Sequence, residues 1–175
     1  MQMLTNPFVW LMRIRHRCGY GVHSPFAFRF ITEVIYEKSS YYAYQDCDKL
    51  LSWRQRFRIR RMYHLLFRCV NYMQPQKMLV KGANQLLERY LQCGCKKALI
   101  LHQTDGTKVD FCYLSSPEEE LMKSLSQKSM LVMDNLRENL NWFKSLPYVL
   151  AFDLYDVGIA FFDPKYNKQC YKVNF

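Results

Sequence analysis

The sequence predicts an α/β fold, because a helical first part is followed by short strands that alternate with helices. Residues 1–74 are very basic and carry helical spacing, whereas residues 75–175 alternate short apolar runs with amphipathic segments. Within Lys77–Cys93, apolar residues run into Gly82 and leucines then recur at helical spacing. A buried strand, a tight turn and a helix in this order begin many α/β cofactor-binding units. We therefore predict an N-terminal basic helical layer over residues 1–74 and a sheet domain over 75–175, packed as one compact unit.

Composition narrows the class of protein further. Hydrophobic residues make up 50% of the chain and aromatic residues 16%, which excludes a disordered chain. A formal charge of +10 favours anionic partners of some kind. Seven cysteines, an odd number scattered through apolar segments, indicate reduced thiols and a cytoplasmic protein. The apolar run near the N-terminus is short and is interrupted by Arg13, so we expect no membrane association.

The first part of the chain contains two helix starts and one long basic helix. Thr5-Asn6-Pro7 and Ser24-Pro25 each place a capping residue before a proline. Apolar residues follow the second start at helical spacing: Phe26, Ala27, Phe30, Ile31, Val34 and Ile35. A single helix is predicted over Trp53–Met73, ended by Pro75. Its narrow apolar stripe consists of Trp53, Phe57, Leu65 or Leu66, and Val70.

The second part is predicted to contain six strands. They are Met78–Lys81, Ala98–His102, Asp110–Leu114, Met130–Asp134, Tyr148–Leu154 and Val157–Phe162. The last two are joined by the tight connection Tyr155-Asp156, which predicts an antiparallel hairpin. Helices are expected after Gly82, after Ser116-Pro117 and after Asp134-Asn135.

Four stretches of this chain resemble a known family. They are GVHSPFAFRFITEVIYEKSSYYAY, VNYMQPQKMLVKG, SMLVMDN and FDLYDVGIAFF, and the Gly-x-His-Ser-Pro-Phe segment is the most distinctive. Together they are similar to class I S-adenosylmethionine-dependent methyltransferases of the O-methyltransferase type, over most of the chain. The resemblance implies a Rossmann-like mixed sheet that ends in an antiparallel hairpin, with the cofactor over the carboxyl ends of the first strands.

Compared with that family, the chain is trimmed between two of its strands. Only the polar turn 103–107 separates Ala98–His102 from Asp110–Leu114, where the family places a further strand and helices. Asp105-Gly106 is a strong hairpin signal, whereas parallel strands need a crossover of about a dozen residues. Either the two strands pair antiparallel, or an extended segment crosses one face of the sheet.

By position, the resemblance places the cofactor at Gly82, Ala83, His102 and Ser115. The family carries a carboxylate before a glycine-rich turn, but here Lys81 precedes a lone glycine. His102 stands where the family has an acid that accepts from both ribose hydroxyls, and one imidazole tautomer makes at most one such bond. Two lost hydrogen bonds to charged groups, at about 1.5–3 kcal/mol each, weaken binding by roughly two to four powers of ten.

Asp134 and Asn135 correspond to the family's metal-binding pair. Asp134 is a weak catalytic candidate, and the pair is a weak remnant of a metal site. The first metal-binding acid of the family is replaced by Ser115, and one carboxylate with one amide holds Mg²⁺ poorly. We favour a structural interpretation, in which Asn135 caps a helix and Glu138 completes a capping box.

Two further motifs have a chemical and a structural interpretation. A zinc site could use four potential ligands, namely Cys93, Cys95, His102 and Cys112, but core or surface thiols are favoured. His23-Ser24 could indicate nucleophilic chemistry, but no acid stands nearby and Ser24 is better placed to cap a helix.

The strongest charge feature is a run of arginines, Arg54, Arg56, Arg58, Arg60 and Arg61. Such a patch could bind the phosphates of a nucleic acid or another anion. We favour instead a solvated helix face whose arginine stems cover apolar surface.

Three functions are compatible with the sequence. The first is a degenerate, non-catalytic methyltransferase-like protein with weak or no S-adenosylmethionine binding, no cofactor and an unidentified protein partner. The second is an active methyltransferase with an altered site, in which Asp134 and His102 lie near the methyl donor. The third is a basic module that binds nucleic acid or another anion through the arginine run.

Overall fold

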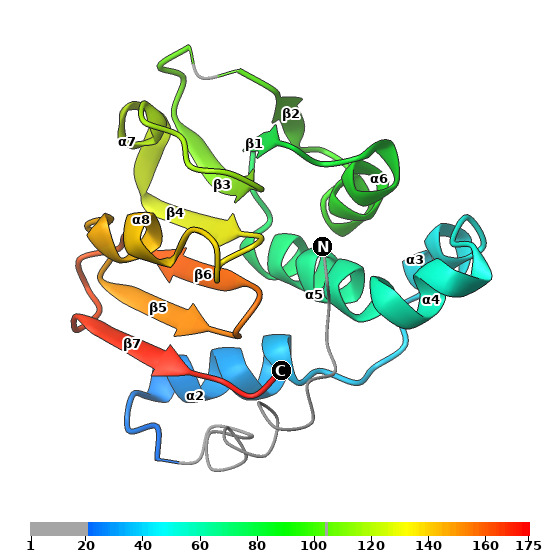
Figure 1. Ribbon diagram of the computed structural model, residues 1–175, viewed down its shortest axis with the longest axis horizontal. Helices are drawn as coiled ribbons and strands as arrows, with labels where there is room; N and C mark the ends of the chain where they lie inside the picture. Colours follow the sequence, from blue (N-terminus) through cyan, green and yellow to red (C-terminus); the bar gives the residue numbers. More distant parts are fainter. Residues whose placement is uncertain (1–20, 104) are drawn as a thin grey trace. The chain divides into compact units, whose positions relative to one another are not determined.

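The computed structural model describes residues 21–103 and 105–175 and divides the chain into two compact units (Figure 1). Unit 1 consists of Met1–Gln74, Asn84–Lys96 and Val173–Phe175, and unit 2 consists of Pro75–Ala83 and Lys97–Lys172. The chain therefore leaves unit 1 at residue 74, returns to it for residues 84–96, and ends in it. The predicted helix start at Thr5-Asn6-Pro7 lies outside the described residues.

Unit 1 is helical over its described residues. Its elements are α2 (Pro25–Phe30), the π-helical turn η2 (Ile31–Ile35), α3 (Tyr42–Asp48), α4 (Trp53–Arg58), α5 (Arg60–Met73) and α6 (Gln85–Gly94). The start predicted at Ser24-Pro25 is confirmed, because Ser24 Oγ accepts a hydrogen bond from Ala27 N–H at 3.3 Å and Pro25 opens the helix. The predicted apolar residues that follow are buried, except for Phe26, which is half-buried.

The prediction of one continuous helix over Trp53–Met73 is wrong. The chain breaks at Ile59, whose φ of −118° and ψ of −18° end α4 and begin α5. A capping box between Ser52 and Gln55 starts the short α4. Since α4 and α5 run in different directions (Figure 1), Trp53 leaves the predicted stripe and is 73% exposed, whereas Leu65, Leu66 and Val70 are buried.

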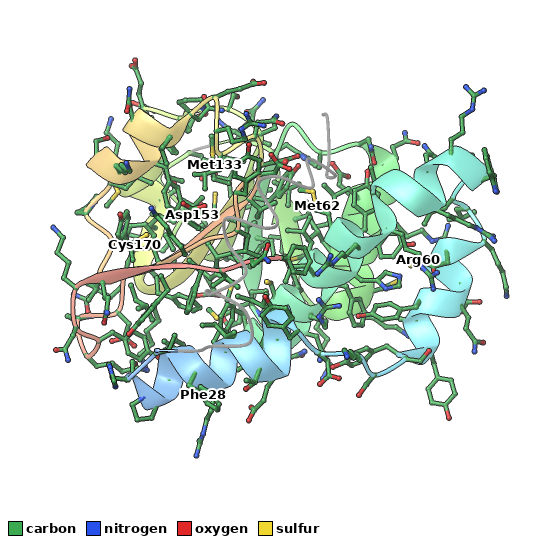
Figure 2. All side chains as sticks on the ribbon, turned by 60° about the horizontal axis from the view of Figure 1, so that its bottom comes forward. Phe28, Arg60, Met62, Met133, Asp153 and Cys170 are labelled. Carbon is green, nitrogen blue, oxygen red and sulfur yellow. The ribbon has the colours of Figure 1, made fainter. Side chains whose placement is uncertain are left out.

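Helices α5 and α6 form the core of unit 1. Gly94 at the end of α6 lets the two backbones approach, because a Cβ there would lie 2.8 Å from Phe67 O and 3.0 Å from Val70 Cβ. Figure 2 labels Met62, which is fully buried, and Arg60, whose side chain is 52% exposed two residues earlier on α5. One side of α5 thus faces the core while the other carries charge.

Unit 2 is a seven-stranded mixed sheet, which confirms the predicted α/β class and is compatible with a Rossmann-like layout. Its strands are β1 (Lys77–Lys81), β2 (Leu99–Leu101), β3 (Val109–Leu114), β4 (Leu125–Met133), β5 (Leu150–Asp153), β6 (Gly158–Phe161) and β7 (Gln169–Lys172). They lie in the order β2-β1-β3-β4-β6-β5-β7. The six predicted strands are all present, and β7 at the edge was not predicted.

Strands β2 and β3 do not pair with each other, because β1 lies between them. Both strands pair with β1 in parallel, one on each side of it, so the antiparallel alternative is wrong. Asp105-Gly106 does form a turn, in which Thr107 N–H donates to Asp105 Oδ1 at 2.9 Å. That turn connects strands that lie on opposite sides of β1, so it does not close a hairpin.

The predicted C-terminal hairpin is confirmed. Strands β5 and β6 pair antiparallel, and β6 also pairs antiparallel with β4. Tyr155 in the connection has a φ of 81°, and Asp153 Oδ1 accepts a hydrogen bond from its N–H at 2.8 Å.

Unit 2 has two short helices, one after each of the predicted starts Ser116-Pro117 and Asp134-Asn135, and they pack on its sheet. They are α7 (Leu121–Ser124) and α8 (Leu140–Ser145). Leu121, Leu136, Phe143 and Leu146 pack with side chains of β1, β3, β4, β5 and β6 in one buried cluster. In the described part of the chain, no helix has both the length and the apolar character needed to cross a membrane.

Candidate functional site

Four of the predicted site residues lie together at the carboxyl ends of β1, β3 and β4. Gly82 follows β1, Ser115 follows β3, and Asp134-Asn135 follow β4. These parallel neighbours end at the same edge of the sheet, which is where open α/β sheets bind ligands. Ser115 N–H donates to Lys81 O at 3.2 Å, and the Asn135 side-chain amide donates to Ser115 O at 3.4 Å.

Gly82 and Ser115 are in direct contact. Gly82 has a φ of +76°, which only glycine adopts easily, and a Cβ built on it would lie 1.7 Å from Ser115 Oγ. The Ser115 side chain therefore occupies the space that the missing Cβ leaves. A ligand cannot use that space for a close approach to the Gly82 backbone while Ser115 keeps this position.

Neighbouring polar groups at this edge bind one another. Lys81 Nζ lies 2.6 Å from Glu118 Oε2, and their side chains are only 26% and 22% exposed. His102 Nδ1 lies 3.3 Å from Val80 O, so the imidazole is held against β1 although the residue as a whole is exposed. Ala83 is half-buried at the point where the chain leaves unit 2.

Asp134 is buried and hydrogen bonded within unit 2. It is 4% exposed, accepts from the Tyr113 hydroxyl at 3.1 Å, and accepts from the Asn135 N–H at 2.8 Å. Burial raises the pKa of Asp134 above its usual value, and these two hydrogen bonds only partly oppose that effect. The carboxyl group thus fastens the end of β4 to β3.

The predicted helix cap at Asn135 is wrong. Asn135 has a φ of 53°, in the left-handed region, whereas an N-cap residue has extended backbone. Its carbonyl accepts from Glu138 N–H at 3.1 Å in a tight turn, and Asn139 precedes α8 instead. Asparagine tolerates the left-handed region better than most residues, which explains why it stands here.

The zinc alternative finds no support among the described residues. Across residues 21–103 and 105–175, no three His, Cys, Asp or Glu side chains converge as metal ligands would. Cys93 Sγ instead lies 3.4 Å from Cys47 Sγ, and Cys112 is fully buried in β3. Burial, with the neighbouring Cys93, raises the pKa of Cys47 to about 12, so this thiol stays protonated at neutral pH.

Unit 1 contains a pocket of about 570 Å³ that the sequence did not predict. It is lined by residues 35–40, by residues of α3, α4 and α5, and by the end of the C-terminal segment. The lining residues are Ile35, Tyr36, Glu37, Lys38, Ser39, Ser40, Tyr44, Arg56, Arg60, Arg61, His64, Arg68, Asn174 and Phe175. Its volume lies within the usual range of small-molecule sites, about 300–1,000 Å³.

The pocket separates the predicted arginine run into two groups. Arg56, Arg60 and Arg61 line it, whereas Arg54 is exposed and does not. The side chain of Arg58 lies outside what the structure describes. Arg61 places its guanidinium 4.2 Å from the ring centroid of Phe175.

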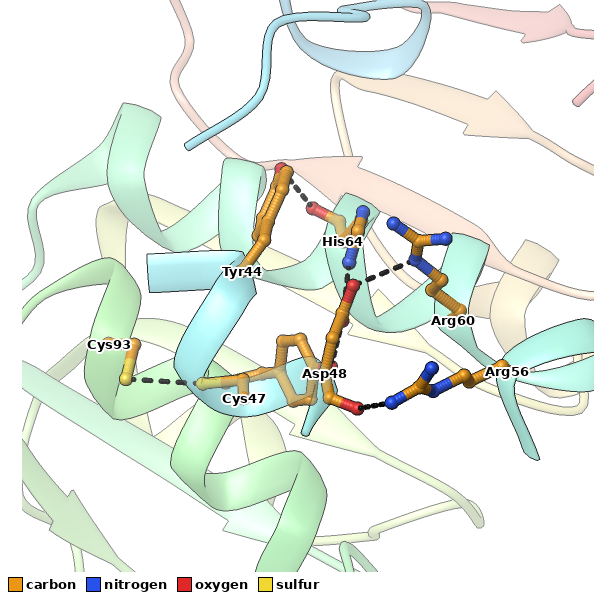
Figure 3. Close-up of polar contacts among 8 residues, drawn as sticks. Tyr44, Cys47, Asp48, Arg56, Arg60, His64 and Cys93 are labelled. Atoms are coloured by element: carbon orange, nitrogen blue, oxygen red, sulfur yellow. Dashed lines mark hydrogen bonds and ion pairs between the residues drawn. The ribbon is translucent and has the colours of Figure 1, made fainter. Parts of the chain in front are cut away.

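Asp48 makes hydrogen bonds and ion pairs with several residues that line the pocket (Figure 3). Its carboxylate lies 2.9 Å from His64 Nε2 and 2.8 Å from Arg60 Nε, and it also accepts from the Tyr90 hydroxyl. Its backbone carbonyl accepts from Arg56 at 3.3 Å. These bonds join the end of α3 to α4, α5 and α6.

Asp48 and His64 differ in their charge at neutral pH. Burial raises the pKa of Asp48, but hydrogen bonds from Tyr90 and His64 and the charge of Arg60 outweigh it, so the pKa lies below its usual value. Burial lowers the pKa of His64 more than Asp48 raises it. At neutral pH the carboxylate is therefore ionised and the imidazole uncharged.

Arg68 is the pocket residue that sequence reasoning missed most clearly. It is 7% exposed, and it donates to Val34 O at 2.6 Å and to Ile35 O at 3.0 Å. The sequence does contain an indication that Arg68 is buried, since this residue interrupts the otherwise apolar run Leu65–Val70. An arginine in such a place is rarely tolerated unless it is hydrogen bonded.

The chain was compared with protein-family models and with curated proteins. No family model matches the chain, and no curated protein matches it either.

Proposed function

We propose that this protein is a methyltransferase-like protein that does not transfer methyl groups and that acts by binding other molecules. The observation that carries the proposal is the contact between Gly82 and Ser115, where a Cβ would lie 1.7 Å from Ser115 Oγ. The turn after β1 is where this family's backbone approaches S-adenosylmethionine. Here a side chain of the protein takes that place.

The strand order supports the ancestry that the proposal implies. Four parallel strands in the order β2-β1-β3-β4 are followed by the antiparallel β6 and by β5. This is the arrangement that the resemblance implies once the strand beyond β2 is removed. The short connection 102–108 stands at the point where that strand would have been.

Two polar positions support the loss of cofactor binding. Lys81, which stands where the family has an acid, is bound to Glu118 at 2.6 Å. His102, which replaces the ribose-binding acid, lies 3.3 Å from Val80 O. The acid that the family has at the first position is therefore missing here, and at the second one imidazole replaces at most one of two hydrogen bonds.

The active-enzyme alternative would rest on Asp134. Its pKa is raised by burial, as is common for catalytic carboxyl groups. However, both carboxylate oxygens have partners, the Tyr113 hydroxyl and the Asn135 N–H. We therefore assign Asp134 to the structure of the sheet edge.

Isothermal titration of the full chain with S-adenosylmethionine and with its demethylated product tests the proposal. We expect no saturable heat at ligand concentrations up to about 1 mM. A micromolar dissociation constant that His102→Ala weakens at least about tenfold would overturn the proposal. Methyl transfer that Asp134→Asn abolishes would establish the active-enzyme alternative.

A further inference from the structure

The pocket of unit 1 carries far more positive than negative charge. Five cationic side chains line it, Lys38, Arg56, Arg60, Arg61 and Arg68, against the single carboxylate of Glu37. Asp48 lies behind Arg60 and pairs with it at 2.8 Å. Among the described side chains that line the pocket, taken together with Asp48, cationic groups therefore outnumber carboxylates by three.

Two of these cations have hydrogen-bond partners that carry no net charge. Arg68 and Arg56 donate to backbone carbonyls, which carry no net charge, and Arg61 lies over the Phe175 ring. Glu37 accepts from Ser39 N–H at 2.6 Å within its own turn. Like charges that converge in a concave, partly desolvated space repel one another, and an anion in that space relieves the repulsion.

The types of side chain indicate which anion fits. Arginine presents a planar fork of donors that matches phosphate and carboxylate oxygens, and the hydroxyl groups of Ser39 and Ser40 add uncharged donors. Several cationic side chains around one pocket favour a multiply charged anion over a single carboxylate. Tyr36 and Phe175 also line the pocket and offer apolar surface to an organic group.

The shape of the site favours a small ligand over a nucleic acid. Arg68 lines the pocket although it is only 7% exposed, so a ligand must enter the pocket to reach it. Arg54, which a nucleic-acid backbone lying along α4 would also contact, is exposed and does not line the pocket. We propose that this pocket binds a phosphorylated small molecule through Arg56, Arg61 and Arg68. The proposal does not depend on whether S-adenosylmethionine binds at the sheet edge of unit 2.

Pyrophosphate is a suitable probe, titrated into the full chain against sodium chloride of matched ionic strength. We expect saturable heat and a rise in the melting temperature that chloride does not produce, since a ligand that binds only the folded state stabilises it. Arg56→Gln and Arg61→Gln should each weaken binding at least about tenfold, the value of one charge-assisted hydrogen bond. Both residues are exposed, so the variants should fold, which circular dichroism checks.

Arg54→Gln is the matched control, because it removes the same charge from the same helix as Arg56→Gln but lies outside the pocket. Its effect on pyrophosphate binding should stay below twofold. The proposal is overturned if Arg54→Gln weakens binding as much as Arg56→Gln, or if pyrophosphate has no effect beyond that of chloride. It is also overturned if an arbitrary single-stranded RNA binds more tightly and both variants weaken that binding equally, which would assign the arginines to a nucleic-acid surface.

Discussion

Gly82 shows how a glycine in the turn after a strand can serve packing within the protein. In a cofactor-binding turn, glycine allows the backbone to approach the ligand, but here it accommodates the Ser115 side chain. The residue type is the same in both roles. Only the position of a residue 33 places later in the sequence distinguishes them, and sequence spacing carries no information about that contact.

Gly82→Ala should destabilise the protein by about 2–4 kcal/mol, because it adds overpacking against Ser115 to the cost of a positive φ. Urea unfolding measures the change. Gly106→Ala is the control, since Gly106 has a φ of +81° but nothing within 4 Å of its Cβ position, and it should cost only about 1–2 kcal/mol. Adding Ser115→Gly to Gly82→Ala should restore the packing part of the loss. Equal losses for the two alanine variants would contradict the contact.

Among the elements, the cluster around Asp48 has the clearest structural role. It links α3 to α5 through His64 and Arg60, and to α6 through Tyr90. The Tyr44 ring stacks on the His64 ring with a centroid distance of 3.7 Å, which keeps the imidazole in place. The three helices therefore share one set of hydrogen bonds that depends on protonation.

The contribution of this cluster to the stability of the protein should fall as the pH is lowered, first through His64 and then through Asp48. Both pKa values are depressed in the folded state, from ordinary values of 6.5 and 3.8, so the unfolded chain binds these protons more readily. The loss through His64 begins below about pH 6.5 and that through Asp48 below about pH 3.8, each with a slope of at most about 1.4 kcal/mol per pH unit.

Urea unfolding between pH 7.5 and pH 5 measures this slope. His64→Gln should flatten it, because the variant has no group at this position that titrates in the range. An unchanged slope in His64→Gln would show that the imidazole does not carry the pH dependence.

At the scale of the whole molecule, each of the two units is built from segments that are not contiguous in the sequence. The sequence predicts a boundary between residues 74 and 75, and one division between the units falls there. Yet α6 lies in unit 1 although it connects two strands of unit 2. Its apolar residues Leu87, Tyr90 and Leu91 are buried, and Gly94 brings it against α5.

A fragment of residues 75–175 should therefore fail to fold cooperatively on its own, because it contains α6 without α5. Near-ultraviolet circular dichroism and urea unfolding would show no fixed aromatic packing and no sharp transition. Co-expression with residues 1–74 should restore both signals. A cooperative transition in the isolated fragment would contradict the assignment of α6 to unit 1.

Local patterns in the sequence were sufficient for the α/β class, the six strands, the β5–β6 hairpin and the helix start at Ser24. Each depends on hydrophobic periodicity or turn chemistry within a few residues of itself. They also placed Gly82, Ser115, Asp134 and Asn135 at the ends of strands, where the structure brings them together.

Three other features depend on groups that are distant in the sequence. The strong Asp105-Gly106 turn signal did not produce a hairpin, because β1 lies between β2 and β3. The role of Arg68 depends on its hydrogen bonds to the carbonyls of Val34 and Ile35, more than 30 residues earlier in the sequence. The cationic pocket combines residues 35–40, three helices and the C-terminal segment. The pairing of strands and the convergence of charges are contacts between remote parts of the chain, and periodicity along the sequence does not encode them.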